Sequence, residues 1–334
     1  MTAGEISKPI FLYKRNLLLT ILAATALFIL EIYIGPGRYP ARQVTEALIH
    51  GRGPAATVIL DIRLPRAIGA VLTGVILGIS GLLLQVSLRN PLAEPYLLGV
   101  SGGASLGVMA ALALAPSLGY MAMDIAGFIG ALLAILLVIL VGELTGYNVY
   151  SVILAGVAVG GMSASLAIII YLAKLETHQL GILWIYGTLS LVGWSEALQL
   201  LVPALLALVY LAIYYSKFNL LLLGDEQAAS MGVSPKALRR GMILVSTITV
   251  GMLTSYTGPI GFIGLMSPHI ARMLVGSEVR RLSILTIPVA ADLTLISDLL
   301  ARNILPGEIP LGSMTALLGV PFFLYLLSRR PAET

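Results

Sequence analysis

Long apolar runs separated by short polar segments dominate the chain. Most of the runs approach the roughly 20 residues that a helix needs to cross the hydrocarbon core of a bilayer. About ten such runs occur, which we place at residues 17–34, 65–87, 96–115, 122–142, 149–172, 195–215, 241–257, 260–275, 283–302 and 310–327. The pattern therefore predicts an all-α polytopic membrane protein with about ten transmembrane helices, organised as one domain over residues 1–334.

Composition strengthens this prediction and limits the chemistry. Of the 334 residues, 58% are hydrophobic and 11% are charged, whereas soluble domains carry about 25% charged residues. The chain has no cysteine, which excludes disulfides and thiolate metal sites, and its three histidines are far apart. Lysine and arginine in such a chain report topology rather than nucleic-acid binding, and their distribution predicts that both termini lie on the cytoplasmic side of a cell membrane.

The eighth predicted span is interrupted. Gly258 to Arg272 reads GPIGFIGLMSPHIAR, and irregular backbone at membrane depth is tolerated only where protein or a water-filled cavity surrounds it. We interpret His269 as a hydrogen-bonded structural residue, although a proton relay or a metal ligand is an alternative. In the ninth span, Asp298 lies four residues before Arg302, a spacing that allows an ion pair. Asp292 has no cation nearby in sequence and is a functional candidate by default.

A pair of arginines stands at the outer mouth of the second predicted span, in the sequence Arg63-Leu64-Pro65-Arg66. Pro65 suits the first turn of a helix, but cations oppose the positive end of the helix dipole there. The residues alone leave two interpretations open. The arginines could extend to lipid headgroups, or they could form a docking point for an acidic partner.

Two segments are predicted on the cytoplasmic side. The sequence Arg89-Asn90-Pro91-Leu92-Ala93-Glu94-Pro95 has two prolines that end one helix and position the next. The second segment, 225–232, has Asp225 as a predicted N-cap and Gly232 as a C-terminal stop. A helix this short is unstable alone. It is therefore either an ordinary amphipathic loop or a helix that docks on a partner.

Together these motifs closely resemble the FecCD-type permeases, the membrane subunits of ABC importers for iron–siderophore complexes, haem and cobalamin. The resemblance rests on the stretch from Gly258 to Arg272, on Leu223 to Val233 and on the order of motifs from Arg63 to Pro321. It implies the type II ABC importer permease fold. It also implies a homodimer that works with two ATP-binding subunits inside and one external substrate-binding protein.

The resemblance also implies roles for particular residues. It implies that coupling to the ATPase involves Gly224, Asp225, Glu226, Ala229 and Gly232. It implies that the external binding protein docks on Arg63, Arg66 and Arg302, and that the translocation gate is formed by Asn90, Leu92, Val149 and Tyr150. A short helix at 181–187 would line part of the path. Two departures stand out. Val149 and Tyr150 lie where the cobalamin permease has small hydroxyl residues, and Gly307 to Pro310 form an insertion before the last span.

Other classes of protein fit less well. The chain has no G-x-x-x-x-G-K-[ST] motif, so we predict that it is not an enzyme and holds no cofactor or metal, with ATP and magnesium bound by the partner ATPase. Membrane lipid is an expected partner and nucleic acid is not.

A secondary active transporter of a small solute remains the main alternative, but it needs a coupling-ion site. A membrane-embedded enzyme would need a catalytic constellation that the sequence does not offer. ATP dependence of uptake separates the two transporters, and the sequence does not name the cargo.

Overall fold

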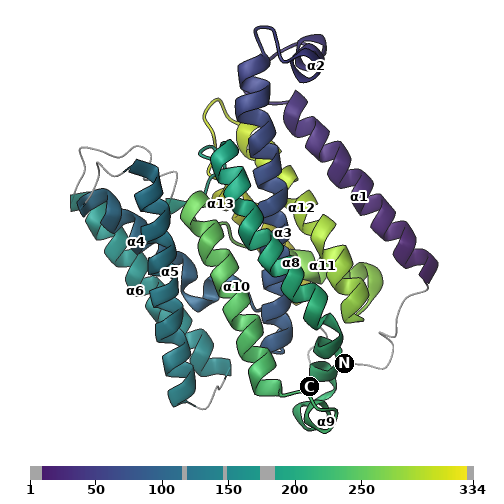
Figure 1. The fold of residues 1–334 in the computed structure, drawn as a ribbon, viewed down its shortest axis with the longest axis vertical. Helices are drawn as coiled ribbons and strands as arrows, with labels where there is room; N and C mark the ends of the chain where they lie inside the picture. The colour runs from purple at the N-terminus through teal and green to yellow at the C-terminus, as the bar shows by residue number, and fades with distance from the viewer. Residues whose placement is uncertain (1–9, 115–118, 146–148, 174–184, 329–334) are drawn as a thin grey trace.

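The computed structural model describes residues 10–114, 119–145, 149–173 and 185–328, and this part of the chain folds into a bundle of helices (Figure 1). In chain order the helices are α1 (Ile10–Tyr33), α2 (Ala41–His50), η1 (Val58–Arg63), α3 (Leu64–Ser87), η2 (Pro95–Leu98), α4 (Val100–Leu114), α5 (Gly119–Leu144), α6 (Val149–Ala173), α8 (Trp194–Leu223), α9 (Asp225–Ser230), α10 (Pro235–Thr257), α11 (Ile263–Val275), α12 (Val279–Asn303) and α13 (Leu311–Ser328).

The predicted spans correspond to these helices. Among the described residues, seven helices are long and apolar enough to cross a membrane, and α4, α11 and α13 are shorter apolar helices. The predicted all-α, multi-span fold is therefore confirmed. The interruption of the eighth span is also present, because α10 ends at Thr257 and α11 begins only at Ile263. The predicted external connection between the first two spans contains two helices that the sequence did not indicate, α2 and η1.

Helix α3 occupies the centre of the bundle and packs against α8, α10, α11 and α12. Nearly all of its residues are buried, as expected for a helix that is apolar on every face. Polar contacts also join it to α10, where the hydroxyls of Ser80 and Thr249 lie 3.0 Å apart and Ser246 donates to the carbonyl of Ser80. Hydroxyl pairs of this kind are a common means of helix association within membranes.

Glycines allow α3 to approach its neighbours closely. A Cβ atom on Gly81 would lie 1.9 Å from the carbonyl oxygen of Gly264 in α11, and one on Gly74 would lie 2.6 Å from that of Ala290 in α12. Neither position has room for a side chain. These two glycines therefore serve helix packing, as small residues commonly do where helices meet in membranes.

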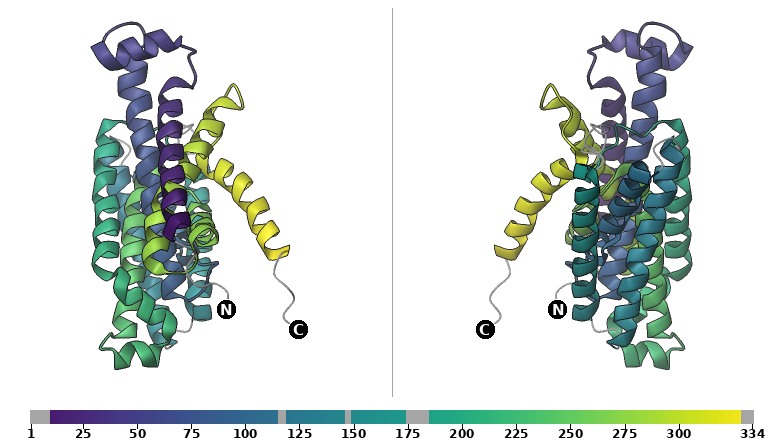
Figure 2. Two further views of the ribbon diagram at one scale, coloured as in Figure 1. Left: turned by 90° about the vertical axis from the view of Figure 1, so that its right-hand side faces the viewer. Right: turned by 90° about the vertical axis from the view of Figure 1, so that its left-hand side faces the viewer.

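The remaining helices define the two ends of the molecule. Helices α4, α5 and α6 pack on one another and join the rest of the bundle mainly through α10. Helix α2 projects at one end and α9 lies at the other (Figure 1). Helix α13 begins in the half of the molecule that carries α2 and slants away from the other helices (Figure 2). We call the α2 end the outer end and the α9 end the inner end.

Candidate functional site

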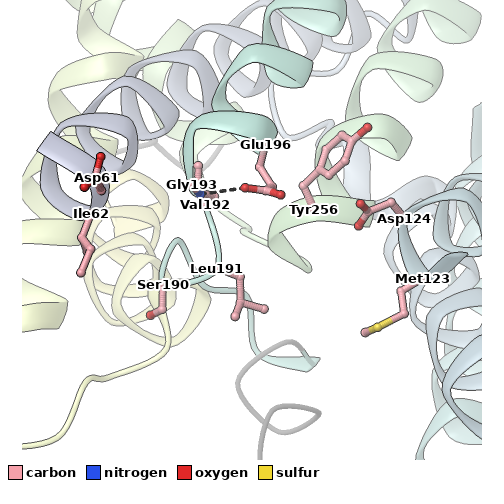
Figure 3. A pocket seen from close by; sticks show the side chains of 10 residues that line it. All are labelled: Asp61, Ile62, Met123, Asp124, Ser190, Leu191, Val192, Gly193, Glu196 and Tyr256. Atoms are coloured by element: carbon pink, nitrogen blue, oxygen red, sulfur yellow. Dashed lines mark hydrogen bonds between the residues drawn. The ribbon is translucent and has the colours of Figure 1, made fainter. Parts of the chain in front are cut away.

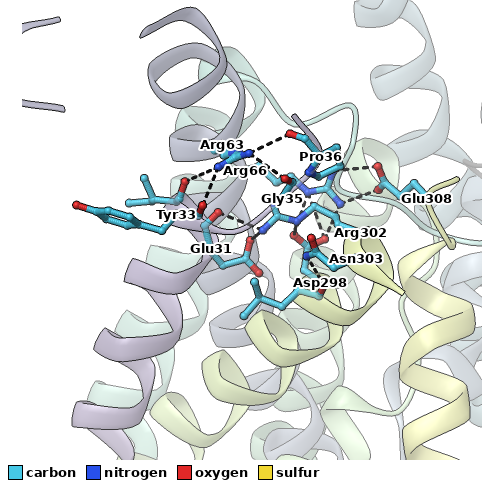
Figure 4. A network of polar contacts seen from close by, with 12 residues as sticks. Glu31, Tyr33, Gly35, Pro36, Arg63, Arg66, Asp298, Arg302, Asn303 and Glu308 are labelled. Atoms are coloured by element: carbon cyan, nitrogen blue, oxygen red, sulfur yellow. Dashed lines mark hydrogen bonds and ion pairs between the residues drawn. The ribbon is translucent and has the colours of Figure 1, made fainter. Parts of the chain in front are cut away.

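Six charged side chains meet at the outer end of the bundle, close to where α3 begins and α12 ends (Figure 4). Three are the arginines that the sequence singled out, and three are acids. We call this group the outer charge cluster. Its members are Glu31, Arg63, Arg66, Asp298, Arg302 and Glu308. With all six ionised, the formal charges cancel.

Arg66 holds two carboxylates at once. One edge of its guanidinium, Nε and Nη2, donates to Asp298 at 2.9 and 2.7 Å, and the other edge, Nη1 and Nη2, donates to Glu308 at 3.1 and 2.6 Å. Such paired contacts match the fixed fork of an arginine. Burial alone would raise the pKa of the Glu308 carboxyl, but the hydrogen bonds and charge of Arg66 outweigh it and hold that pKa below its ordinary value.

Arg302 joins α12 to the first helix. Its Nη2 atom donates to a carboxylate oxygen of Glu31 and, at 3.2 Å, to the carbonyl of the same residue. The Nε atom of Arg302 also lies 3.2 Å from Asp298, so the predicted i, i+4 ion pair is present. Glu31 is fully buried in α1. Separation in sequence hid this partner, because Glu31 lies 271 residues before Arg302.

Arg63 has backbone rather than carboxylate partners. Its guanidinium donates to the carbonyls of Ile32, Tyr33, Gly35, Pro36 and Gly37 at 2.9 to 3.2 Å. These residues form the end of α1 and the turn that follows it. Arg63 therefore ties this turn to the start of α3 and satisfies carbonyls that the end of a helix leaves open.

The three predicted docking arginines therefore lie together, but they point inward. Arg63, Arg66 and Arg302 are only 2%, 6% and 5% exposed, so they neither extend to lipid headgroups nor stand as free external cations. Each of them has internal partners in the isolated chain. The docking role implied by the resemblance remains a prediction, and it now requires a change in this cluster.

An acidic pocket of about 370 Å³ lies beside the cluster (Figure 3). Its lining includes Asp61, Asp124 and Glu196, with Ser190 and Tyr256 among the other residues. Glu196 accepts a hydrogen bond from the backbone of Gly193 at the start of α8. Within the described part of the chain, no three potential ligands are arranged to hold a metal ion. Sequence reasoning did not identify this pocket, because its acids come from three separate elements.

At the inner end, the predicted coupling segment forms the short helix α9, with Ala228 buried and its neighbours exposed. One detail of the prediction is wrong: Gly224, with φ at 131°, is the N-cap, and Asp225 is the first helical residue. The Asp225 side chain instead accepts hydrogen bonds from Arg89 at 2.6 Å and Arg239 at 2.8 Å. Gly232 has a φ of 78°, which suits its predicted role as a stop.

The same arginines connect α9 to the end of α3. Arg89 also donates to the carbonyl of Leu221, and Arg239 donates to that of Ser87. Arg89 directly precedes Asn90 and has a positive φ of 48°, which is uncommon for a residue other than glycine. Arg89 therefore connects α9 to the turn that begins at Asn90.

The four predicted gate residues lie on two elements. Asn90 accepts a hydrogen bond from the backbone of Leu92, which closes a tight turn. Val149 and Tyr150 begin α6, and Tyr150 is 83% exposed. Most of the predicted path helix at 181–187 lies outside the described residues. The gate remains a prediction.

The interrupted eighth span is held by side chains of the turn after α3. Glu94 accepts a hydrogen bond from the backbone of Phe262, which has a positive φ of 68°, and the Tyr96 hydroxyl accepts one from the backbone of Ile260 at 3.0 Å. These contacts satisfy backbone groups that would otherwise be unpaired at membrane depth. His269 lies edge-on to Phe322 of α13, which fits a structural role.

Comparisons with known proteins agree with this geometry. The model of the FecCD transport family matches residues 21–329. The iron chelatin transport system permease of Helicobacter pylori is 37% identical over 273 residues, which cover 81% of this chain and 82% of the relative. The ferric enterobactin transport system permease FepD of Escherichia coli is 35% identical and covers 98% of both chains.

A solved structure is also similar. It is described as an inward-facing conformation of a metal-chelate type ABC transporter, and it has a TM-score of 0.80 and 27% identity over 95% of this chain and 100% of that one. The predicted permease fold is therefore confirmed. On the extent of the family match, the chain belongs to the FecCD transport family.

Proposed function

We propose that this chain is the membrane-spanning permease subunit of a binding-protein-dependent ABC importer that carries an iron complex, as a siderophore or haem, or cobalamin. The match of the family model over residues 21–329 carries this proposal. Relatives named for ferric enterobactin, hemin and ferric dicitrate transport support an iron complex as cargo. The chain is the permease and not the ATPase, so ATP and magnesium belong to a partner subunit.

In this proposal two copies form the pore, with two ATP-binding subunits at the inner end and one external binding protein at the outer end. The complex lies in the cytoplasmic membrane with both termini inside. Helix α13 exposes apolar side chains in the isolated chain: Leu317, Val320 and Leu324 are 67%, 44% and 59% exposed. That apolar surface is available to a second copy or to lipid.

Coupling to the ATPase is assigned to Gly224, Asp225, Glu226, Ala229 and Gly232 around α9. The two glycines permit the sharp turns at either end. The exposed residues between them face outward from the bundle, where a partner can contact them. The ion pairs of Asp225 then transmit movement to Arg89 and to the gate turn at Asn90 and Leu92. Val149 and Tyr150 of α6 complete the gate.

Docking of the external protein is assigned to the outer charge cluster through Arg63, Arg66 and Arg302. The outer position of the cluster and the guanidinium chemistry support this assignment. An arginine fork binds a carboxylate through two parallel hydrogen bonds.

Cross-linking tests the coupling site directly, because the chain has no native cysteine. A single Ala229→Cys should cross-link to the ATPase subunit in the purified complex. Leu205→Cys, on the exposed apolar face of α8, serves as the control and should not. Equal cross-linking at both positions, or none at Ala229→Cys, would remove α9 from the interface.

The alternative is a secondary active transporter. Asp292 favours it, because this acid sits within α12 and its Oδ1 atom has no hydrogen-bond partner among the described residues. Uptake by the reconstituted complex decides between the two. An importer requires ATP hydrolysis, whereas uptake driven by an ion gradient without ATP would establish the alternative.

A further inference from the structure

Glu308 fastens the loop between α12 and α13 to the rest of the outer end. Its carboxylate accepts two hydrogen bonds from Arg66 of α3 and one from the hydroxyl of Ser190, which precedes α8. The next residue, Ile309, donates its backbone N–H to Ala301 at 3.0 Å. One side chain therefore links three elements that are distant in sequence.

The two carboxylates on Arg66 differ in accessibility. The side chain of Asp298 is 0% exposed, whereas that of Glu308 is 25% exposed. Asp298 lies on a packed helix and also contacts Arg302, but Glu308 lies on a loop. The outward edge of Arg66 is therefore the edge on which one carboxylate can replace another.

This loop leads directly into α13. Gly312, in the first turn of that helix, donates its backbone N–H to Gly187 at 3.4 Å, and a Cβ atom on Gly312 would lie 2.2 Å from the carbonyl of Tyr186. Beyond this point α13 slants away from the bundle (Figure 2). The outer attachment of α13 is thus the part of the helix most able to set its position.

We propose that Glu308 is an exchangeable latch. In the free permease it occupies the outward edge of Arg66 and keeps the α12–α13 loop closed; on docking, a carboxylate of the external binding protein replaces it and releases the loop and the outer end of α13. The inference rests on the proposed function, because it requires an external partner.

Charge balance explains why a partner carboxylate would replace Glu308 rather than bind beside it. Arg66 and Arg302 already share three carboxylates, and Arg63 is engaged by backbone carbonyls. The six charges cancel, so a further carboxylate would leave a buried site with an uncompensated negative charge, which is costly. Replacement of Glu308 keeps the balance and preserves the paired hydrogen bonds of the arginine fork. The released Glu308 moves into water, where its charge is solvated.

A mobility measurement tests whether the latch opens. Leu305 lies in the same loop and is 56% exposed, so Leu305→Cys carrying a nitroxide label reports on the loop in a chain without other cysteines. The complete transporter in lipid nanodiscs is the sample. We expect label mobility to rise when the purified external binding protein is added, and to be high without it in the Glu308→Gln variant.

A docking measurement tests the exchange. The Glu308→Gln variant lacks the competing carboxylate, so it should bind the external protein about five-fold more tightly than the wild type. This factor is at the upper end of the range for a partly exposed ion pair. Glu46→Gln removes an acid from the exposed Arg42–Glu46 pair at the outer end. It should change neither the mobility of the label nor the affinity for the external protein. If Glu308→Gln does not assemble, Ser190→Ala removes only one contact of Glu308 and should shift both readouts in the same direction by a smaller factor.

Weaker or unchanged docking by Glu308→Gln, in complexes whose wild type shows ATP-dependent uptake, would overturn the latch and leave the proposed function standing. Absence of ATP-dependent uptake in the wild type would instead overturn the proposed function. A label that is equally mobile in all samples would also overturn the latch.

Discussion

Replacing Arg302 by methionine should strongly destabilise the permease, because the change leaves the buried carboxylate of Glu31 without its cation. Glu31 is fully buried, and its Oε1 atom already has no hydrogen-bond partner among the described residues. The Asp298 carboxylate is less affected, since Arg66 still donates hydrogen bonds to both of its oxygens. The loss of stability therefore comes mainly from the Glu31 carboxylate in α1.

The magnitude follows from burial. Removing one partner of a buried ion pair typically costs about 3–5 kcal/mol. The exposed pair Arg42–Glu46, with 89% of the Arg42 side chain accessible, gives the matched control, and its loss should cost less than about 0.5 kcal/mol. The predicted difference between Arg302→Met and Arg42→Met is therefore several times larger than the usual error of the measurement.

Unfolding of the purified protein in mixed micelles measures these free energies. The decisive variant combines Arg302→Met with Glu31→Leu, which removes the stranded charge together with its cation. We expect this double variant to recover at least about 2 kcal/mol relative to Arg302→Met, because apolar replacement of a whole buried pair is often close to neutral. Additive losses in the double variant, or equal losses for Arg302→Met and Arg42→Met, would refute the assignment of Glu31 as the partner of Arg302.

Three further predictions use the same reasoning. Asp225→Ala should lower transport by about five-fold while ATP hydrolysis continues, because α9 loses its ties to α3 and α10; a matched fall in both activities would contradict this. Gly81→Ala should cost about 1–3 kcal/mol of stability through overpacking against α11, and Gly161→Ala, which has open space around it, should be tolerated. The lowered pKa of Glu308 means that its ion pair is intact at neutral pH and is lost as pH falls through that depressed pKa. The Leu305→Cys label should therefore become mobile only below the ordinary glutamate pKa of about 4.3, and release near pH 6 would contradict this.

The spans, the interrupted eighth helix and the short helix α9 were predictable because they depend on local properties. Apolar run length, glycine and proline positions act over a few residues, and the i, i+4 spacing of Asp298 and Arg302 is local as well. These predictions agree with the structure.

The partners of the buried arginines and of Asp225 could not be predicted, because they come from other parts of the sequence. Nothing near Arg66 or Arg302 in sequence indicates Glu308 or Glu31, which lie 242 and 271 residues away. The arginines were therefore expected at the surface, and the structure shows them buried among acids. Asp225 illustrates the same limit: its sequence position suits an N-cap, but two distant arginines use its carboxylate instead.

Sided transport in proteoliposomes shows whether the chain works as an ATP-driven importer in the proposed orientation. The permease is reconstituted with its ATPase, and uptake of a labelled ferric siderophore or haem is measured with ATP supplied only on the α9 side and the binding protein only on the α2 side. We expect uptake that requires both ATP and the binding protein, and that stops when either is removed or placed on the wrong side. Uptake driven by an ion gradient in the absence of ATP would contradict it.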